Sequence, residues 1–155
     1  MPGHVSIRVS DLEASVQFYL TALGPLSYKD MRFPSVVGLG STSSNDPIPD
    51  FWLRQHTPGP QNSHAAKPTP VHVSFYVGEP KLVDEFHAAG IRAGGSDNGQ
   101  PGERPWFRGY YGNDSETYVL YYSGTYLLTA INPAAYILDL DGNNIEVVCF
   151  LKHTK

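Results

Sequence analysis

"HVSIRVSDLEASVQFYLTALG" (residues 4–24) and "HVSFYVGEPKLVDEFHAAGIR" (residues 72–92) repeat one pattern within a single chain. The same offset of 68 residues, from position 4 to position 72, places His4 on His72 and keeps the two stretches in step without a gap. Similarity at a fixed spacing indicates a structural unit that occurs more than once. We therefore expect two modules of the same local fold.

Each copy opens with residues that alternate between apolar and polar. This period of two predicts strands over 4–9 and 72–77, with Val5 and Val73 on the apolar faces and a histidine on each polar face. If helices cover the apolar faces, the polar faces must line a different part of the molecule.

A helix is predicted after each of these strands, because apolar residues recur at helical spacing. Ser10 and Glu13 form an S-x-x-E capping box that would begin the first helix. His87 lies on the second helix and is expected to be exposed.

Each copy also ends in an apolar strand, "DFWL" (50–53) and "IEVVCF" (145–150), and aligning these pairs Trp52 with Glu146. The stretch between the copies is rich in proline and polar residues and reads as a linker. We expect one domain, 1–155, made of module 1 (about 3–54), a linker (about 55–70) and module 2 (about 71–150). The predicted class is α+β, with two β-α-β-β-β modules.

Composition narrows the range of partners. Charged residues make up 17% of the chain and the net charge is −4, which argues against nucleic acid or an anionic membrane as a partner. No apolar run is long enough to cross a bilayer, and the first residues lack the layout of a signal peptide. The single cysteine, Cys149, cannot form an internal disulfide, so a cytoplasmic protein is expected.

The polar faces of the predicted strands carry three residues that could bind a metal ion. His4, His72 and Glu146 all fall on faces turned away from the helices, since Ile145 and Val147 take the helix side. Two imidazoles and one carboxylate match the 2-His-1-carboxylate pattern that binds Zn, Fe, Mn, Ni or Co and leaves positions open for substrate. The alternative is that the histidines are hydrogen-bonded structural residues and that Glu146 faces solvent from a half-exposed strand.

These stretches, together with "DLDGNNIEVV" (139–148), resemble the vicinal oxygen chelate superfamily, which includes glyoxalases, bleomycin-resistance proteins and extradiol dioxygenases. The resemblance implies a cup-shaped, curled mixed sheet with helices outside, and His4, His72 and Glu146 as ligands of one divalent metal ion. It also implies a homodimer and a small-molecule substrate bound through neighbouring oxygens. Glu146 would be a catalytic residue as well as a ligand, because it could help to move a proton.

Two features depart from the resemblance. Trp52 occupies the position of a fourth ligand in glyoxalases and cannot bind a metal, which puts true glyoxalase I chemistry in doubt. His72 and Glu146 are 74 positions apart whereas His4 and Trp52 are 48 apart, and the extra length lies at about 113–132. That segment could form a hairpin that covers the cup or extends a dimer interface; a retained intron translated in frame is the alternative.

The leading functional hypothesis is a metal-dependent, glyoxalase-like enzyme of lyase or isomerase type. The alternatives are an extradiol-type Fe(II) dioxygenase and a metal-free protein that sequesters a ligand, as bleomycin-resistance proteins do. Arg8 and Arg54 could hold an anionic substrate group. The alternative is that either points to solvent from a strand end, and this alternative is stronger for Arg54. The expected substrate-binding residues are Arg8, Trp52, Tyr76, Arg108, Tyr110 and Tyr111.

Overall fold

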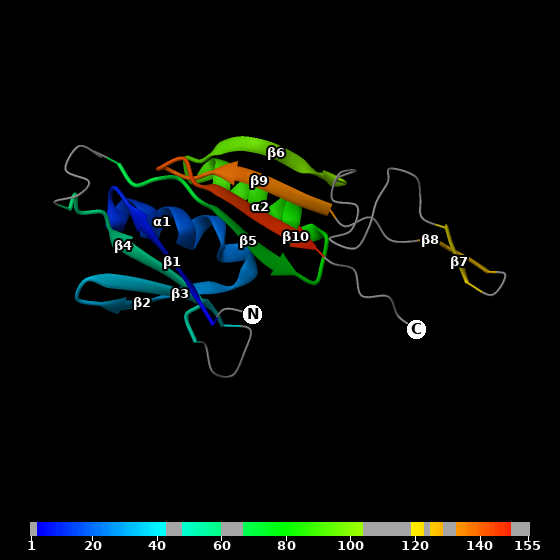
Figure 1. Ribbon diagram of the computed structural model, residues 1–155, viewed down its shortest axis with the longest axis horizontal. Coiled ribbons are helices and arrows are strands. Elements are labelled where there is room, and N and C mark those ends of the chain that lie inside the picture. The colour runs from blue at the N-terminus through cyan, green and yellow to red at the C-terminus, as the bar shows by residue number, and fades with distance from the viewer. Residues whose placement is uncertain are drawn as a thin grey trace.

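The computed structural model describes residues 3–42, 48–59, 67–103, 119–122, 125–128 and 133–149. Within them, two four-stranded sheets lie side by side (Figure 1). The first sheet, sheet 1, has the strand order β1 (Val5–Val9), β4 (Phe51–Gln55), β3 (Val36–Ser41), β2 (Tyr28–Phe33). Sheet 2 has the order β5 (His72–Val77), β10 (Asn144–Cys149), β9 (Pro133–Leu138), β6 (Ser96–Glu103).

The two sheets have the same topology. β1 pairs in parallel with β4, and β5 pairs in parallel with β10, whereas the other pairs are antiparallel. Helix α1 (Leu12–Ala22), followed by the short 3-10 helix η1 (Gly24–Leu26), follows β1, and α2 (Lys81–Arg92) follows β5. The predicted α+β fold of two β-α-β-β-β modules is confirmed, and the curled sheets do not close into a barrel.

Strand register confirms the alignment of the two copies. Trp52 on β4 lies opposite Ser6 on β1, and Glu146 on β10 lies opposite Ser74 on β5. Ser6 and Ser74 are equivalent positions of the repeat. Trp52 and Glu146 therefore occupy the same place in their modules.

One hydrophobic core joins both modules. Most of the apolar residues on the inward faces of the strands are buried, although Val5 at the start of β1 is 40% exposed, and α1 and α2 contact each other behind the sheets (Figure 1). Phe75 of module 2 packs edge-on against Tyr28 and Phe51 of module 1, with ring centroids 5.5 and 5.3 Å apart. The opposite, outward faces of both sheets are covered by neither helix.

Helix α1 begins one residue later than the capping-box pattern predicts. Asp11 is the N-cap, and its side chain accepts a hydrogen bond from the amide of Ala14 at 3.0 Å. The Ser10 amide instead donates to Asp141 Oδ2, and Glu13 pairs with Arg32 on β2. The capping-box prediction was wrong because Asp11 offers an equally good cap, while Ser10 is used to join the two modules.

His87 is buried, and the prediction that it is exposed was wrong. Its Nε2 lies 2.9 Å from Asp97 Oδ1 on β6, which packs against α2. This hydrogen bond, together with those from the Gly99 amide and the Gln100 side chain, lowers the pKa of Asp97 to about 2. Helical spacing alone could not show that β6 would supply a carboxylate at this point.

The end of α2 approaches other backbone closely at Gly95. A Cβ atom there would lie 2.9 Å from Leu138 O, 3.0 Å from Gly90 O and 3.0 Å from a ring carbon of Phe18. The first two contacts are with backbone, which cannot turn aside as a side chain can.

Gly95→Ala is therefore expected to destabilise the protein by about 1–3 kcal/mol, the usual cost of overpacking. Chemical denaturation monitored by circular dichroism measures the free energy of unfolding. Gly24→Ala is the matched control, because a Cβ there meets nothing within 4 Å. Equal stability of the two variants would contradict the close approach at Gly95.

A further antiparallel pair lies within 113–132, the segment that we predict to be an insertion in module 2. β7 (Val119–Tyr122) and β8 (Thr125–Leu128) pair with each other, as the composition of 113–132 predicts, and in the described residues they pair with neither four-stranded sheet. A role for this hairpin as a cover stays a prediction. None of the helices in the described ranges is long and apolar enough to cross a membrane.

Candidate functional site

Glu146 lies in the middle of sheet 2, on the outward face. Its neighbours across the strands are Ser74 on β5 and Tyr136 on β9. Only 1% of the residue is exposed, so the alternative in which Glu146 faces solvent from a half-exposed strand is wrong. A carboxylate in this position is costly unless another group compensates for the loss of water.

His72 supplies one compensating contact. Its Nε2 lies 3.0 Å from Glu146 Oε2, and the imidazole packs against Tyr136 with ring centroids 6.2 Å apart. The His72 side chain is 51% exposed, so the pair is buried on the carboxylate side and open on the imidazole side. Two of the three predicted ligands are thus brought together in one chain.

The turn before β10 determines where this pair forms. Asp139 Oδ1 accepts hydrogen bonds from the amides of Asp141 and Asn143 at 2.9 and 2.8 Å, which closes the turn. Asn143 Oδ1 in turn accepts from the Val71 amide at 2.9 Å, immediately before His72. The "DLDGNN" run therefore fixes the start of β5 against the start of β10, and with it the positions of His72 and Glu146.

The same carboxylate ties the turn to the first module. Asp139 Oδ2 accepts from Asn143 Nδ2 at 2.8 Å and from the Tyr19 hydroxyl of α1 at 2.5 Å. Burial, reinforced by the charge of Asp139, raises the pKa of Tyr19 well above its usual value. The phenol is therefore held protonated, as a donor to Asp139 requires.

One oxygen of Glu146 has no hydrogen-bond partner among the described residues. Oε1 is buried, and no described residue donates a hydrogen bond to it. Buried polar atoms in native proteins nearly always have partners, and an exception calls for an ion, a water molecule or a functional role. A carboxylate oxygen beside an imidazole nitrogen fits the donor set of a divalent transition metal.

His4 does not join this pair within one chain. It is exposed just before β1, and its ring meets Trp52 edge-on with centroids 6.3 Å apart. In the described part of the chain, no group of three His, Cys, Asp or Glu residues is arranged to hold a metal ion. The three-ligand site stays a prediction, with His4 on sheet 1 and the other two residues on sheet 2.

Trp52 is held in place at the position of module 1 that is equivalent to Glu146. Its Nε1 donates to Pro49 O at 3.2 Å, and its ring lies 5.6 Å from that of Phe33. Gly38, opposite Trp52 on β3, leaves room for the indole: a Cβ there would lie 2.7 Å from Pro49 Cβ and 3.1 Å from Trp52 Cη2. The indole is thus an ordered wall on the outward face of sheet 1.

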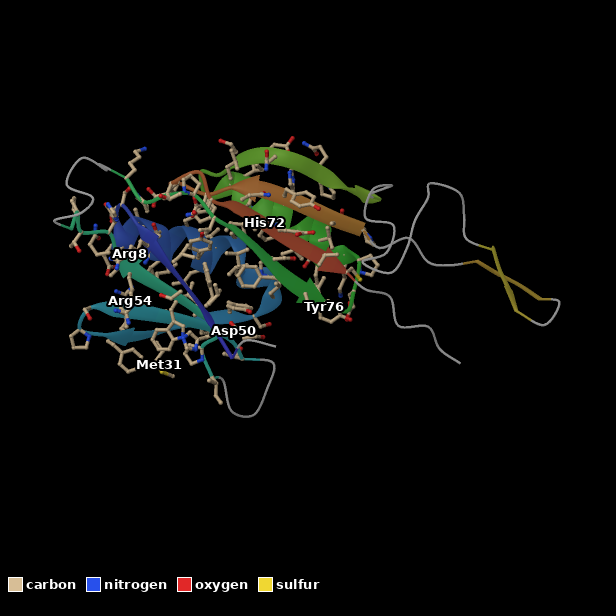
Figure 2. All side chains as sticks on the ribbon, viewed as in Figure 1. Arg8, Met31, Asp50, Arg54, His72 and Tyr76 are labelled. Atoms are coloured by element: carbon tan, nitrogen blue, oxygen red, sulfur yellow. The ribbon has the colours of Figure 1, made fainter. Side chains whose placement is uncertain are left out.

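The other predicted substrate-binding residues fall into two groups. Arg8 and Tyr76 are exposed on the outward faces of sheets 1 and 2, at separate places in Figure 2. Arg108, Tyr110 and Tyr111 lie outside the described residues. Sequence reasoning missed Tyr136 and Phe33; strand alternation would have placed each on an outward face had their strands been aligned with β10 and β4.

The two-module fold agrees with the sequence comparison. A sequence profile of the Glyoxalase/Bleomycin resistance protein/Dioxygenase superfamily matches residues 2–147. The chain belongs to this superfamily. No curated protein matches the chain.

Solved structures with the same architecture come from several bacteria. A glyoxalase/bleomycin resistance protein from Albidiferax ferrireducens T118 is 26% identical, with a TM-score of 0.66, over 97% of this chain and 99% of that one. A family enzyme from Burkholderia phytofirmans PsJN is 19% identical, with a TM-score of 0.61, over 96% and 98%. The oxidase ChaP-H2 is 19% identical, with a TM-score of 0.54, over 99% and 96%. The last two show the fold alone.

Proposed function

We propose that the protein is a metal-dependent, glyoxalase-like enzyme of lyase or isomerase type that binds a small oxygenated substrate. The observation that carries this proposal is the buried Glu146 Oε1 with no hydrogen-bond partner, beside His72. An orphaned carboxylate oxygen in a strand is unfavourable for folding alone, so it points to a bound cation.

Each residue of the centre has a separate role. His72 and Glu146 would hold the metal ion, and Tyr136 limits how the imidazole can turn. The bound ion would supply Lewis-acid stabilisation of negative charge on a substrate oxygen. Glu146 would also take or return a proton at the carboxylate oxygen that does not hold the ion.

His4 would come from a second copy of the chain. The His4 ring lies against Trp52 on the outward face of sheet 1, and the His72–Glu146 pair lies on the outward face of sheet 2. Neither face is covered by a helix. A two-fold homodimer that places sheet 1 of one copy over sheet 2 of the other would create two equivalent centres. This arrangement supplies the ligand that one chain lacks.

Mixing two inactive variants tests this arrangement. His4→Ala and His72→Ala are each expected to bind no stoichiometric metal when purified alone. Refolded together, half of the dimers would carry both variants and one of their two centres would be intact, so about a quarter of the wild-type metal content should return. Metal analysis of the refolded mixture measures it, with His4→Ala refolded alone as the control. No recovery would contradict a centre shared between two copies.

A metal-free ligand-binding protein is the second candidate, and the rigid Trp52 wall favours it. Metal analysis of wild-type protein purified without chelator separates the two functions. Stoichiometric metal that is lost in His72→Ala supports the enzyme. Absence of metal, with tight binding of apolar ligands, supports sequestration. Oxygen uptake with catechols would then identify the extradiol reaction among the enzymes.

A further inference from the structure

Two arginines stand side by side on the outward face of sheet 1. Arg8 and Arg54 are Cα partners in the parallel β1–β4 pair, and strands in such a pair lie about 4.8 Å apart. Both are exposed at the same end of the sheet (Figure 2). Like charges directly opposite each other on neighbouring strands are destabilising.

Neither arginine has an ion-pair partner among the residues that the structure describes. In the described ranges no carboxylate lies within ion-pair distance of Arg8 or Arg54, whereas Arg32 on the same sheet contacts Glu13 at 2.7 Å and Asp30 at 2.8 Å. A pair of free guanidinium groups is well suited to a bidentate anion such as a carboxylate.

Trp52 and Phe33 form an aromatic wall next to the two arginines on the same face of sheet 1. Trp52 precedes Arg54 by two residues on β4, so their side chains leave the same face about 6.6 Å apart. Phe33 extends the wall across the sheet, where it is 46% exposed. The Pro49 carbonyl and Gly38 fix the indole in place before any ligand arrives.

We propose that this face binds the substrate as an aromatic acid, with a flat apolar ring against Trp52 and a carboxylate at Arg8 and Arg54. The proposal rests on the proposed function, because it names the class of substrate for that centre. It follows from the juxtaposition of a preformed ring-stacking surface and two unpaired cations. A neutral substrate would leave the repulsion between the arginines uncompensated.

Calorimetric titration with 2-naphthoate and with its neutral isostere, naphthalene-2-carboxamide, tests both parts of the surface. Wild-type protein is expected to bind the acid about tenfold more tightly than the amide, as loss of one charge-assisted contact implies. Arg8→Gln and Arg54→Gln should each remove most of that preference without weakening the amide. Trp52→Ala should weaken both ligands. Arg32→Gln, whose guanidinium already has partners, should leave both affinities unchanged.

Equal affinity for acid and amide, or no effect of the two arginine variants, would overturn the proposal. Loss of dimer in Trp52→Ala by sedimentation velocity would assign the wall to a subunit contact and overturn it as well. The titrations are made on chelator-treated protein and on Glu146→Gln, so they do not depend on the metal. Failure of the binding surface is therefore distinguishable from failure of the proposed metal centre.

Discussion

Glu146→Gln is expected to bind no metal at concentrations that saturate the wild type, and yet to raise the stability of the metal-free protein. Glutamine keeps the shape of the side chain and a hydrogen bond to His72, but it removes a buried charge whose Oε1 has no partner. Burying a charged oxygen without a compensating hydrogen bond is costly, and removal of the charge relieves that cost. We expect a gain of roughly 1 kcal/mol, or about 2–4 °C in Tm for a domain of this size.

With added metal, the wild type is expected to become more stable than Glu146→Gln. A ligand that binds only the folded state stabilises it by about 2.7 kcal/mol at a hundred times its Kd, and only the wild type would gain this. Differential scanning calorimetry with chelator and with excess metal measures both orders. A Glu146→Gln protein that is less stable than wild type in chelator would show that Glu146 is a structural group, and retained metal would remove it from the centre.

Asp139→Ala is expected to cause the largest loss of stability in the chain. The Asp139 carboxylate is buried and accepts four hydrogen bonds, which come from the Asp141 amide, the Asn143 amide and side chain, and the Tyr19 hydroxyl. Alanine would leave these donors buried without an acceptor. Breaking a buried charged network in this way costs about 3–5 kcal/mol.

The measurement is the free energy of unfolding in denaturant, with Glu85→Ala on the exposed side of α2 as the control. Asp139→Asn should lose less, because its one carbonyl oxygen can still accept from the two turn amides. Metal affinity should fall together with stability in Asp139→Ala, since the turn aligns His72 with Glu146. A loss of less than about 1 kcal/mol would mean that water replaces the carboxylate without penalty.

Much of the fold was predictable because the duplication repeats each local signal. Alternation at Val5 and Val73 predicted the first strand of each module, and the pairing of Trp52 with Glu146 predicted the equivalent last strands. The closeness of His72 and Glu146 also followed, because both were placed on the same face of strands in one module.

Other features depend on contacts that local patterns do not encode. The burial of His87 on α2 depends on its contact with Asp97 on β6. Asp11 rather than Ser10 caps α1, because the Ser10 amide donates a hydrogen bond to Asp141 in the other module. The separation of His4 from His72 within one chain is a matter of how two modules pack. Neither copy of the repeat specifies whether its outward sheet face meets the other module of the same chain or a module of a second chain.

The contacts of Phe75 with Tyr28 and Phe51 make the boundary between the two modules asymmetric. Two modules of identical sequence would present identical residues at the boundary between them. Phe75 stands where the repeat has Ile7 in module 1, so the aromatic contacts between the modules involve residues that the two copies do not share. Because one hydrophobic core contains residues of both modules, we expect the two modules to unfold together.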